Sequence, residues 1–233
     1  MDRMEYVEVA RAESERGELV LRERRENGAA AVLELRANGT FVMDSRETTT
    51  EQALADAALA LVAEPRAVLV GGLGLGYTMR QVLADHRVER CSVVEIEPAL
   101  VEWMRDGTVP HGPALLADER ANPVVADIAV AVAEAPDASC DLVLLDVDNG
   151  PQHLVHDRNA GLYRRPFLSE VRRMLRPGGV VAIWSAERSP ELEATLNEVF
   201  GSSEAAGYDV NLQGRGEKYW LHVARVRAVA SDG

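Results

Sequence analysis

Four acidic residues follow apolar segments of the chain, at positions where acids could do chemistry together. Glu95 closes the apolar stretch 92–96, Asp127 ends a third apolar stretch, and Asp146 and Asp148 follow the run "CDLVLL". Because consecutive parallel strands end at one crevice, we expect these carboxylates to border one pocket. Such carboxylates can accept hydrogen bonds from hydroxyl groups or amines, and a desolvated one can take up a proton.

A glycine-rich turn precedes these acids in the sequence. The stretch "AVLVGGLGLGYTMRQVLADH" predicts a strand over 67–70, a turn with Gly72, Gly74 and Gly76, and a helix over 77–86. Glycines at such a turn let the backbone bend sharply and approach a ligand closely. The pattern is G-x-G-x-G and departs from the dinucleotide fingerprint G-x-G-x-x-G.

The spacing of Glu95 indicates the kind of ligand. Glu95 follows Gly76 by about nineteen residues, close to the ~20-residue spacing at which an acid binds ribose hydroxyls. A 2′-phosphate would be repelled there, which argues against NADP. Glu95 alone does not distinguish NAD from S-adenosylmethionine as the ligand. The structural alternative is that the glycines form only a tight turn and Glu95 a solvated strand end.

Each of these acids also has a purely structural interpretation. Asp127 could cap the helix that follows it, and Asp146 and Asp148 could form an Asx turn. Asp148 is expected in the loop after the strand, bordering the same pocket as Asp146. Tyr163 is a candidate for substrate contact or a core residue.

A second group of polar residues lies nearby in the sequence. His153, His156 and Asp157 raise the possibility of a metal site. The spacing fixes no third ligand, and Gly150 with Pro151 favours a loop, so we predict no metal and a solvated lid instead.

The elements that position these residues fall into two groups. The first fifty residues contain short alternating or apolar segments, with turn signals at Gly17, Gly28 and residues 38–39, which predicts a small β-rich lobe. A helix capped by Thr49 or Thr50 is expected next. We expect a lobe over 1–50 and a second domain over 51–233.

From residue 67 onward, predicted strands and helices alternate. The helix before the fifth strand is expected to end at the Pro-Gly-Gly of residues 177–179, and "GYDVNL" with "KYWLHVARV" predicts a terminal β pair. Repeated βα units indicate an α/β fold with a Rossmann-like, mostly parallel sheet and a terminal antiparallel strand.

Composition narrows the classes of partner. The 233 residues are 47% hydrophobic, so we expect a sizeable core. Their formal net charge is −13, so we do not expect binding to nucleic acid. Cys91 and Cys140 stand alone, which suggests a reducing compartment. No apolar run approaches the ~20 residues of a membrane span, so we expect a cytoplasmic protein without a membrane partner.

Several motifs, in order along the chain, resemble the spermidine synthase family within the S-adenosylmethionine-dependent methyltransferase superfamily. They are the glycine loop, "VVEIEP", "VVADIAVAV", "DLVLLDVDNGP" and "GLYRRPFLSEVRRMLRPGGVVAIW", over roughly residues 67–184. The resemblance implies a seven-stranded methyltransferase-type sheet, an N-terminal β lobe and a homodimer.

The resemblance also implies roles for individual residues. Glu95 would bind the ribose hydroxyls, Asp127 the adenine amino group, and Asp146 would orient or deprotonate an attacking amine. Together with the reasoning from the residues, this leads us to expect Asp146, Asp148 and Tyr163 as the catalytic residues. The residues implied to bind S-adenosylmethionine, or its decarboxylated form, are Gly72, Gly74, Leu75, Gly76, Glu95, Ile96, Asp127, Ile128 and Asp146.

Two departures from the family pattern bear on the transferred group. The aminopropyltransferases resemble "GGGDGG" in the glycine loop, and here Leu75 stands at the position of that acid. An apolar side chain does not offset a buried ammonium, whereas intact S-adenosylmethionine carries its own carboxylate. The lobe also lacks the family's Tyr-His-Glu element for polyamines.

We therefore expect a transferase that uses intact S-adenosylmethionine to methylate a small nucleophile. The alternatives are an aminopropyltransferase that uses decarboxylated S-adenosylmethionine, and a non-catalytic nucleoside-binding or dimerisation protein.

Overall fold

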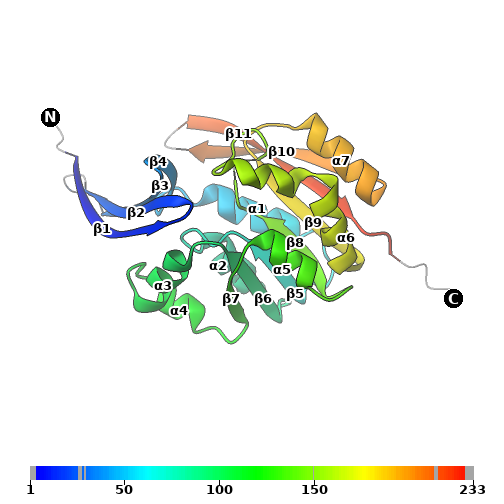
Figure 1. The fold of residues 1–233 in the computed structure, drawn as a ribbon, viewed down its shortest axis with the longest axis horizontal. Helices are drawn as coiled ribbons and strands as arrows, with labels where there is room; N and C mark the ends of the chain where they lie inside the picture. The colour runs from blue at the N-terminus through cyan, green and yellow to red at the C-terminus, as the bar shows by residue number, and fades with distance from the viewer. Residues whose placement is uncertain (1–3, 26–27, 29, 149, 213–214, 229–233) are drawn as a thin grey trace.

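The N-terminal part of the chain forms a separate antiparallel sheet. The computed structural model describes residues 4–25, 28, 30–148, 150–212 and 215–228. Four strands pair in chain order: β1 (Glu5–Ser14), β2 (Gly17–Arg25), β3 (Val32–Ala37) and β4 (Thr40–Asp44). Figure 1 shows this lobe, in blue, projecting from the rest of the molecule. The predicted β-rich lobe is confirmed.

A seven-stranded sheet forms the centre of the molecule. Its order is β10 (Ser203–Leu212), β11 (Arg215–Arg225), β9 (Leu175–Ser185), β8 (Cys140–Leu145), β5 (Ala67–Gly71), β6 (Arg90–Glu95) and β7 (Ala121–Val125). The five strands from β9 to β7 are parallel, whereas β11 runs antiparallel to β9 and β10 antiparallel to β11. The expected Rossmann-like sheet and terminal antiparallel pair are confirmed.

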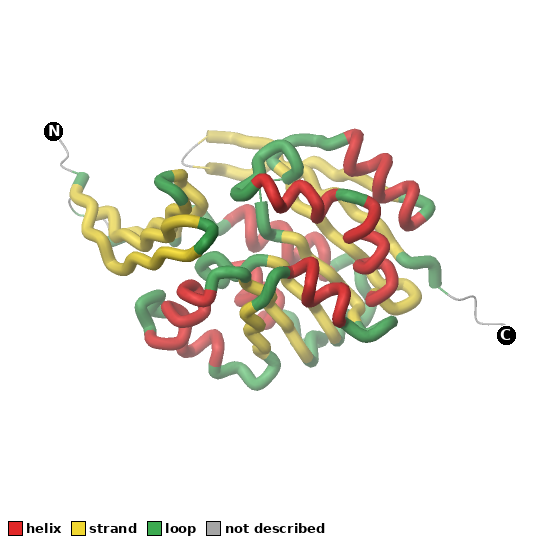
Figure 2. Tube along the Cα trace, in the orientation of Figure 1, coloured by secondary structure: helices red, strands yellow, loops and turns green. Residues whose placement is uncertain are grey.

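Helices cover both faces of this sheet (Figure 2). One face packs against α1 (Thr49–Leu59), α2 (Tyr77–Ala84) and α3 (Pro98–Asp106), with the short α4 (Gly112–Leu116) beside α3. The other face packs against α5 (Ile128–Glu134), α6 (Arg165–Met174) and α7 (Pro190–Phe200). Strand residues alternate between the two, so Val68 and Val70 face the first group and Leu69 the second.

The chain reverses its direction of strand addition at β5. The path β5–β6–β7 extends the sheet one way, and β8 then returns to the other side of β5. In open parallel sheets, ligands bind outside the carboxyl ends of the strands at such a switch point. This fold therefore directs attention to the loops after β5 and β8.

The lobe and the larger sheet share one apolar core. Leu21 and Leu35 of the lobe belong to the same buried cluster as Leu54 and Ala58 of α1. The division into 1–50 and 51–233 stays a proposal, since α1 begins at Thr49 and takes part in this joint core.

Two local predictions differ from the structure. The residue before α1 is Thr48, and its side chain makes no capping hydrogen bond. Helix α6 ends at Met174, and β9 begins at Leu175 and runs through the Pro-Gly-Gly segment. The strand continues there because Leu175 pairs with Cys140, and Gly178 N–H donates to the carbonyl oxygen of Val226.

Candidate active site

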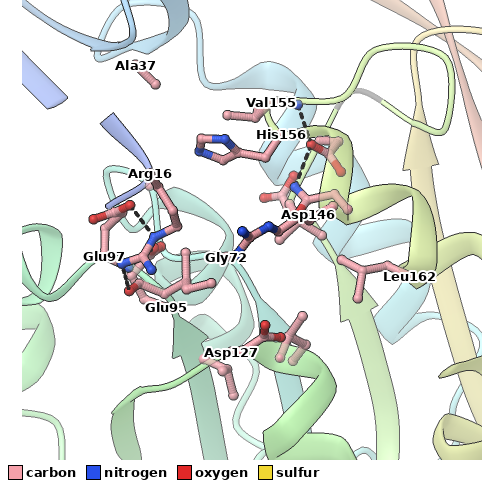
Figure 3. A pocket seen from close by; sticks show the side chains of 18 of the residues that line it. Arg16, Ala37, Gly72, Glu95, Glu97, Asp127, Asp146, Val155, His156 and Leu162 are labelled. Atoms are coloured by element: carbon pink, nitrogen blue, oxygen red, sulfur yellow. Dashed lines mark hydrogen bonds and ion pairs between the residues drawn. The ribbon is translucent and has the colours of Figure 1, made fainter. Parts of the chain in front are cut away.

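A cavity of about 1410 Å³ opens at the carboxyl ends of β5, β6 and β8. The lobe forms one wall, and the segment that contains the 3₁₀ helix η1 (Asp157–Tyr163) forms another. Figure 3 shows Glu95, Asp127 and Asp146 around this space, with Gly72 between Glu95 and Asp146. The carboxylates expected to share one pocket do share it.

The glycine loop after β5 is held by close backbone contacts. Gly72 has a φ of +95°, and a Cβ there would lie 2.3 Å from the carbonyl oxygen of Asp146. Gly74 has a φ of +50°, and its Cβ would lie 2.6 Å from the sulfur of Met43 in the lobe. Both residues line the cavity. Glycine is needed here for contact within the protein as well as for access to the cavity.

Leu75 and Gly76 lie beside the cavity and do not line it. The Leu75 side chain is fully buried in the core, and its carbonyl oxygen is 2.7 Å from Nε2 of His111. Gly76 is the residue before α2, in the left-handed conformation. Leu75 stands at the position of the family's acid, and its side chain therefore lies outside the space that a ligand would fill.

Glu95 organises the glycine loop and still has capacity to bind. Its Oε2 accepts a hydrogen bond from Leu73 N–H at 2.9 Å, and its Oε1 accepts one from Glu97 N–H at 2.8 Å. Burial raises its pKa, and these backbone donors oppose that rise. A carboxylate has about four acceptor sites, so Glu95 keeps capacity for hydroxyl donors such as those of a ribose diol.

Asp127 serves as a helix cap and also faces the cavity. It is the residue before α5, and its Oδ1 accepts from Ala129 N–H at 2.8 Å. Its side chain is exposed and lines the cavity. Ile96 and Ile128 also line the cavity. The cap uses one oxygen, so the other is available for a donor such as an exocyclic amine.

Asp146 has a single side-chain partner at the cavity wall. The hydroxyl of Thr78 on α2 donates to its Oδ2 at 2.5 Å. Burial raises the pKa of Asp146, and the Thr78 hydrogen bond lowers it. A carboxylate with so few donors and a raised pKa is suited to accept a proton from, or bind, a cationic ligand.

Asp148 holds the segment that follows β8. Its Oδ1 accepts from Val155 N–H at 2.6 Å and from Asn159 Nδ2 at 2.9 Å, and its Oδ2 accepts from the Tyr163 hydroxyl at 3.0 Å. Asp148 lines the cavity, but Tyr163 is buried and does not. Tyr163 therefore reaches the site only through Asp148.

The two histidines of this region have different surroundings. His156 lines the cavity, whereas His153 is exposed and lies 3.3 Å from Glu187. Within the described ranges, no three histidine, cysteine or acidic side chains form a group that could hold a metal.

Several cavity residues were not anticipated from the sequence. Glu51, in the first turn of α1, lines the cavity, and so do Tyr77 and Arg16. Arg16 lies in the β1–β2 turn, and its Nε donates to Glu97 Oε1 at 2.6 Å (Figure 3). The pattern Thr48-x-x-Glu51 is typical of a capping box, which gives Glu51 an ordinary explanation and conceals its place in the site.

Residues 47–203 match the spermine/spermidine synthase domain, and the chain belongs to that family. The family resemblance seen in the motifs is thus confirmed. Binding of an S-adenosylmethionine-type nucleoside is consistent with this family and with the positions of Glu95 and Asp127.

Relatives of two kinds are similar in sequence. Polyamine aminopropyltransferase 2 of Pseudomonas aeruginosa is 33% identical over 168 residues, which are 67% of this chain and 46% of that protein. Putrescine N-methyltransferase 3 of Nicotiana tabacum is 32% identical over 125 residues, which are 53% of this chain and 31% of that protein. The chain thus spans less than half the length of these two relatives.

Solved structures support the fold. Spermidine synthase from Thermotoga maritima superimposes with a TM-score of 0.74 at 19% sequence identity, covering 94% of this chain and 72% of the other. In the described part of the chain, no helix is long and apolar enough to cross a membrane.

Proposed function

We propose that the chain is an aminopropyltransferase that transfers the aminopropyl group of decarboxylated S-adenosylmethionine to an aliphatic amine such as putrescine. The observation that carries this proposal is the cavity wall made by Asp146 and its acidic surroundings, in a member of the spermine/spermidine synthase family. The first relative described above is named as an enzyme of this kind.

The donor would lie along the ends of β5, β6 and β7. Glu95 would accept hydrogen bonds from both ribose hydroxyls, and the free oxygen of Asp127 would accept one from the adenine amino group. Ile96 and Ile128 supply apolar surface beside the base. The sulfonium donor supplies an electrophilic carbon bonded to its positively charged sulfur.

The acceptor would approach from the Asp146 side. Asp146 would take the amine's excess proton and hold the nitrogen in line with the carbon–sulfur bond. The nitrogen then forms the new C–N bond as the C–S bond breaks, and sulfur keeps the electron pair. The products are spermidine, when putrescine is the acceptor, and neutral methylthioadenosine. The new secondary amine keeps its two hydrogens and carries the positive charge that left the sulfur, so the only proton released is the one that Asp146 took.

On the sequence alone, the replacement of an acid by Leu75 favours methyl transfer. That reason loses its force here, since the Leu75 side chain is buried in the core and does not line the cavity. An acid that faces the cavity is present elsewhere, at Glu51.

Methyl transfer from intact S-adenosylmethionine to a diamine is the second candidate. The similarity to the Nicotiana tabacum putrescine N-methyltransferases favours it specifically. Both candidates use an amine acceptor and the same roles for Asp146 and Glu95. A homodimer and a cytoplasmic location stay predictions.

Donor preference tests the proposal directly. In calorimetric titrations of intact S-adenosylmethionine, its decarboxylated form and methylthioadenosine, we expect the decarboxylated form to bind more tightly than the intact form. Preference for the intact form would support methyl transfer. Absence of binding by all three would contradict the nucleoside site itself.

A further inference from the structure

Glu51 occupies a place in the cavity that helix capping does not explain. It lies in the first turn of α1, but Thr48 makes no capping hydrogen bond. The Glu51 carboxylate instead accepts a hydrogen bond from the neighbouring Thr50 hydroxyl at 2.6 Å and lines the cavity. Its side chain is therefore turned towards the site.

The charges that act on Glu51 are of its own sign. Asp146 and Asp44 are the acidic groups whose charges act on it, and Asp44 is already paired with Arg24 at 3.5 Å. No ion pair of Glu51 or Asp146 with an arginine or lysine is seen in the part of the chain that the structure describes. Both carboxylates line the same cavity, and we call them the uncompensated pair.

Burying two like charges without a cation is costly, so such a pair needs a proton or a bound cation. Consistent with this, burial and the charge of Asp146 raise the pKa of Glu51 to about 7. A metal does not fit, since the described residues offer no group of three ligands. An ammonium group does fit, because it donates up to three hydrogen bonds and carries one charge.

The adjoining cavity wall indicates what the ammonium is attached to. Leu35, Val42 and Met43 of the lobe line the same cavity and present aliphatic surface. Tyr77 and Thr78 of α2 add hydroxyl groups near the acids. A protonated nitrogen on a short aliphatic chain matches both kinds of surface.

We propose that Glu51 is the second carboxylate of the acceptor site, which binds the protonated amine of an aliphatic diamine together with Asp146. This inference rests on the proposed function and specifies how that site selects cationic amines over neutral nucleophiles. Glu51 contacts the acceptor only, so its removal leaves the nucleoside site unchanged.

Amine affinity should follow the ionisation of Glu51. We would titrate putrescine into protein saturated with methylthioadenosine at pH 6 and pH 8. Because the Glu51 pKa is about 7, its ionised fraction rises about tenfold over this range. Wild-type affinity should rise by about the same factor, and Glu51→Gln should remove most of that rise and weaken binding at pH 8 about tenfold.

Other groups near Glu51 are controlled by comparing variants. The groups that face it are Asp146 after β8, Asp44 of β4, Tyr77 of α2 and Tyr219 of β11, and His156 lines the same cavity. All of these groups are retained in Glu51→Gln. The difference in the pH dependence of putrescine affinity between wild type and this variant is therefore caused by Glu51. Glu51→Asp keeps the charge and should keep the pH dependence.

The exposed Glu102 of α3 provides a matched control, and Glu102→Gln should bind putrescine as the wild type does. Methylthioadenosine affinity should be the same in every variant, which shows that each one is folded. Equal putrescine binding by wild type and Glu51→Gln at pH 8 would overturn the inference alone. Failure of the wild type to bind putrescine at pH 8 would overturn the proposed function with it.

Discussion

Among single residues, Asp146 is buried, accepts few hydrogen bonds from the protein and lines the cavity. Its one side-chain partner is Thr78, whereas Asp148 accepts three hydrogen bonds that hold its own segment. The two acids of one short stretch therefore differ in role. Asp146 is suited to proton transfer, and Asp148 to positioning.

Replacing Asp146 by Asn should remove the proton acceptor and keep the shape of the site. General base catalysis typically contributes 10²–10⁴-fold, so we expect kcat to fall by at least about 10²-fold. Methylthioadenosine affinity, measured by calorimetry, should change less than about twofold. Asp209→Asn, on an exposed residue of β10, is the control. A kcat within threefold of wild type would rule out the role given to Asp146.

Glu95, Asp127 and Asp146 could be predicted from the sequence because each follows an apolar strand of a recognisable βα unit. Glu51 could not, because the groups that act on it come from β4, β11 and the end of β8, far away in the sequence, and its local pattern suits a capping box. Leu75 was placed at the ligand by alignment alone. In the structure, the Leu75 side chain lies in the core. The turn before it has a φ of +50° at Gly74, which packs against Met43.

At the scale of elements, the turn after β5 joins three parts of the molecule. Gly72 lies against the backbone of Asp146, Gly74 lies against Met43 of the lobe, and Leu73 N–H donates to Glu95. The turn therefore fixes the ends of β5, β6 and β8 relative to one another and to the lobe.

A methyl group at Gly72 should disturb this junction. Gly72→Ala introduces a left-handed alanine and a 2.3 Å approach to the Asp146 carbonyl oxygen, and we expect it to lower the free energy of unfolding by about 3 kcal/mol or more. Gly39→Ala has a similar φ, +75°, with nothing within 4 Å of the new Cβ, and should cost only about 1–2 kcal/mol. Urea denaturation would compare them, and equal losses would show that the contact with Asp146 is unimportant.

One buried hydroxyl, that of Tyr163, takes part in holding the segment after β8. Tyr163→Phe removes a hydrogen bond to Asp148 and leaves an acceptor partly unpaired, which should cost about 1 kcal/mol of stability. We expect a several-fold loss of kcat/KM and faster proteolysis within residues 150–163. Tyr6→Phe, on an exposed tyrosine of β1, should change neither. Unchanged proteolysis of Tyr163→Phe would mean that Asp148 is held without it.

At the scale of the whole molecule, an acidic protein carries buried acids at its central cavity. Burial raises the pKa of Glu95, Asp146 and Asp148, and that of Glu51 to about 7. A carboxyl whose pKa is higher in the folded state binds more protons when folded. Its contribution to stability therefore falls as the pH rises from the unfolded to the folded pKa.

For Glu51 this loss begins near its ordinary pKa of 4.5 and is complete above about pH 7. Glu51→Gln should consequently be more stable than wild type at pH 8, by about 1–3 kcal/mol, and nearly equal to it at pH 4.5. Urea denaturation at both values tests this, with Glu102→Gln expected to follow the wild type. A less stable Glu51→Gln at pH 8 would contradict the uncompensated pair.

Most of the fold follows from sequence patterns that are local. Alternating strands with turn glycines define the lobe, and apolar runs followed by amphipathic helices define the parallel sheet. The prediction that a helix ends at residues 177–179 is wrong, although Pro-Gly-Gly usually ends elements. Here, pairing of β9 with the distant β8, and a bond to Val226, keep this segment in the sheet.

Product analysis tests the central claim most directly. The purified protein would be incubated with putrescine and either decarboxylated or intact S-adenosylmethionine, and the products identified by mass spectrometry. The account predicts spermidine and methylthioadenosine from the decarboxylated donor, and little or no methylated putrescine from the intact one. Methylated putrescine as the sole amine product would contradict it, and absence of turnover with both donors would favour a non-catalytic nucleoside-binding protein.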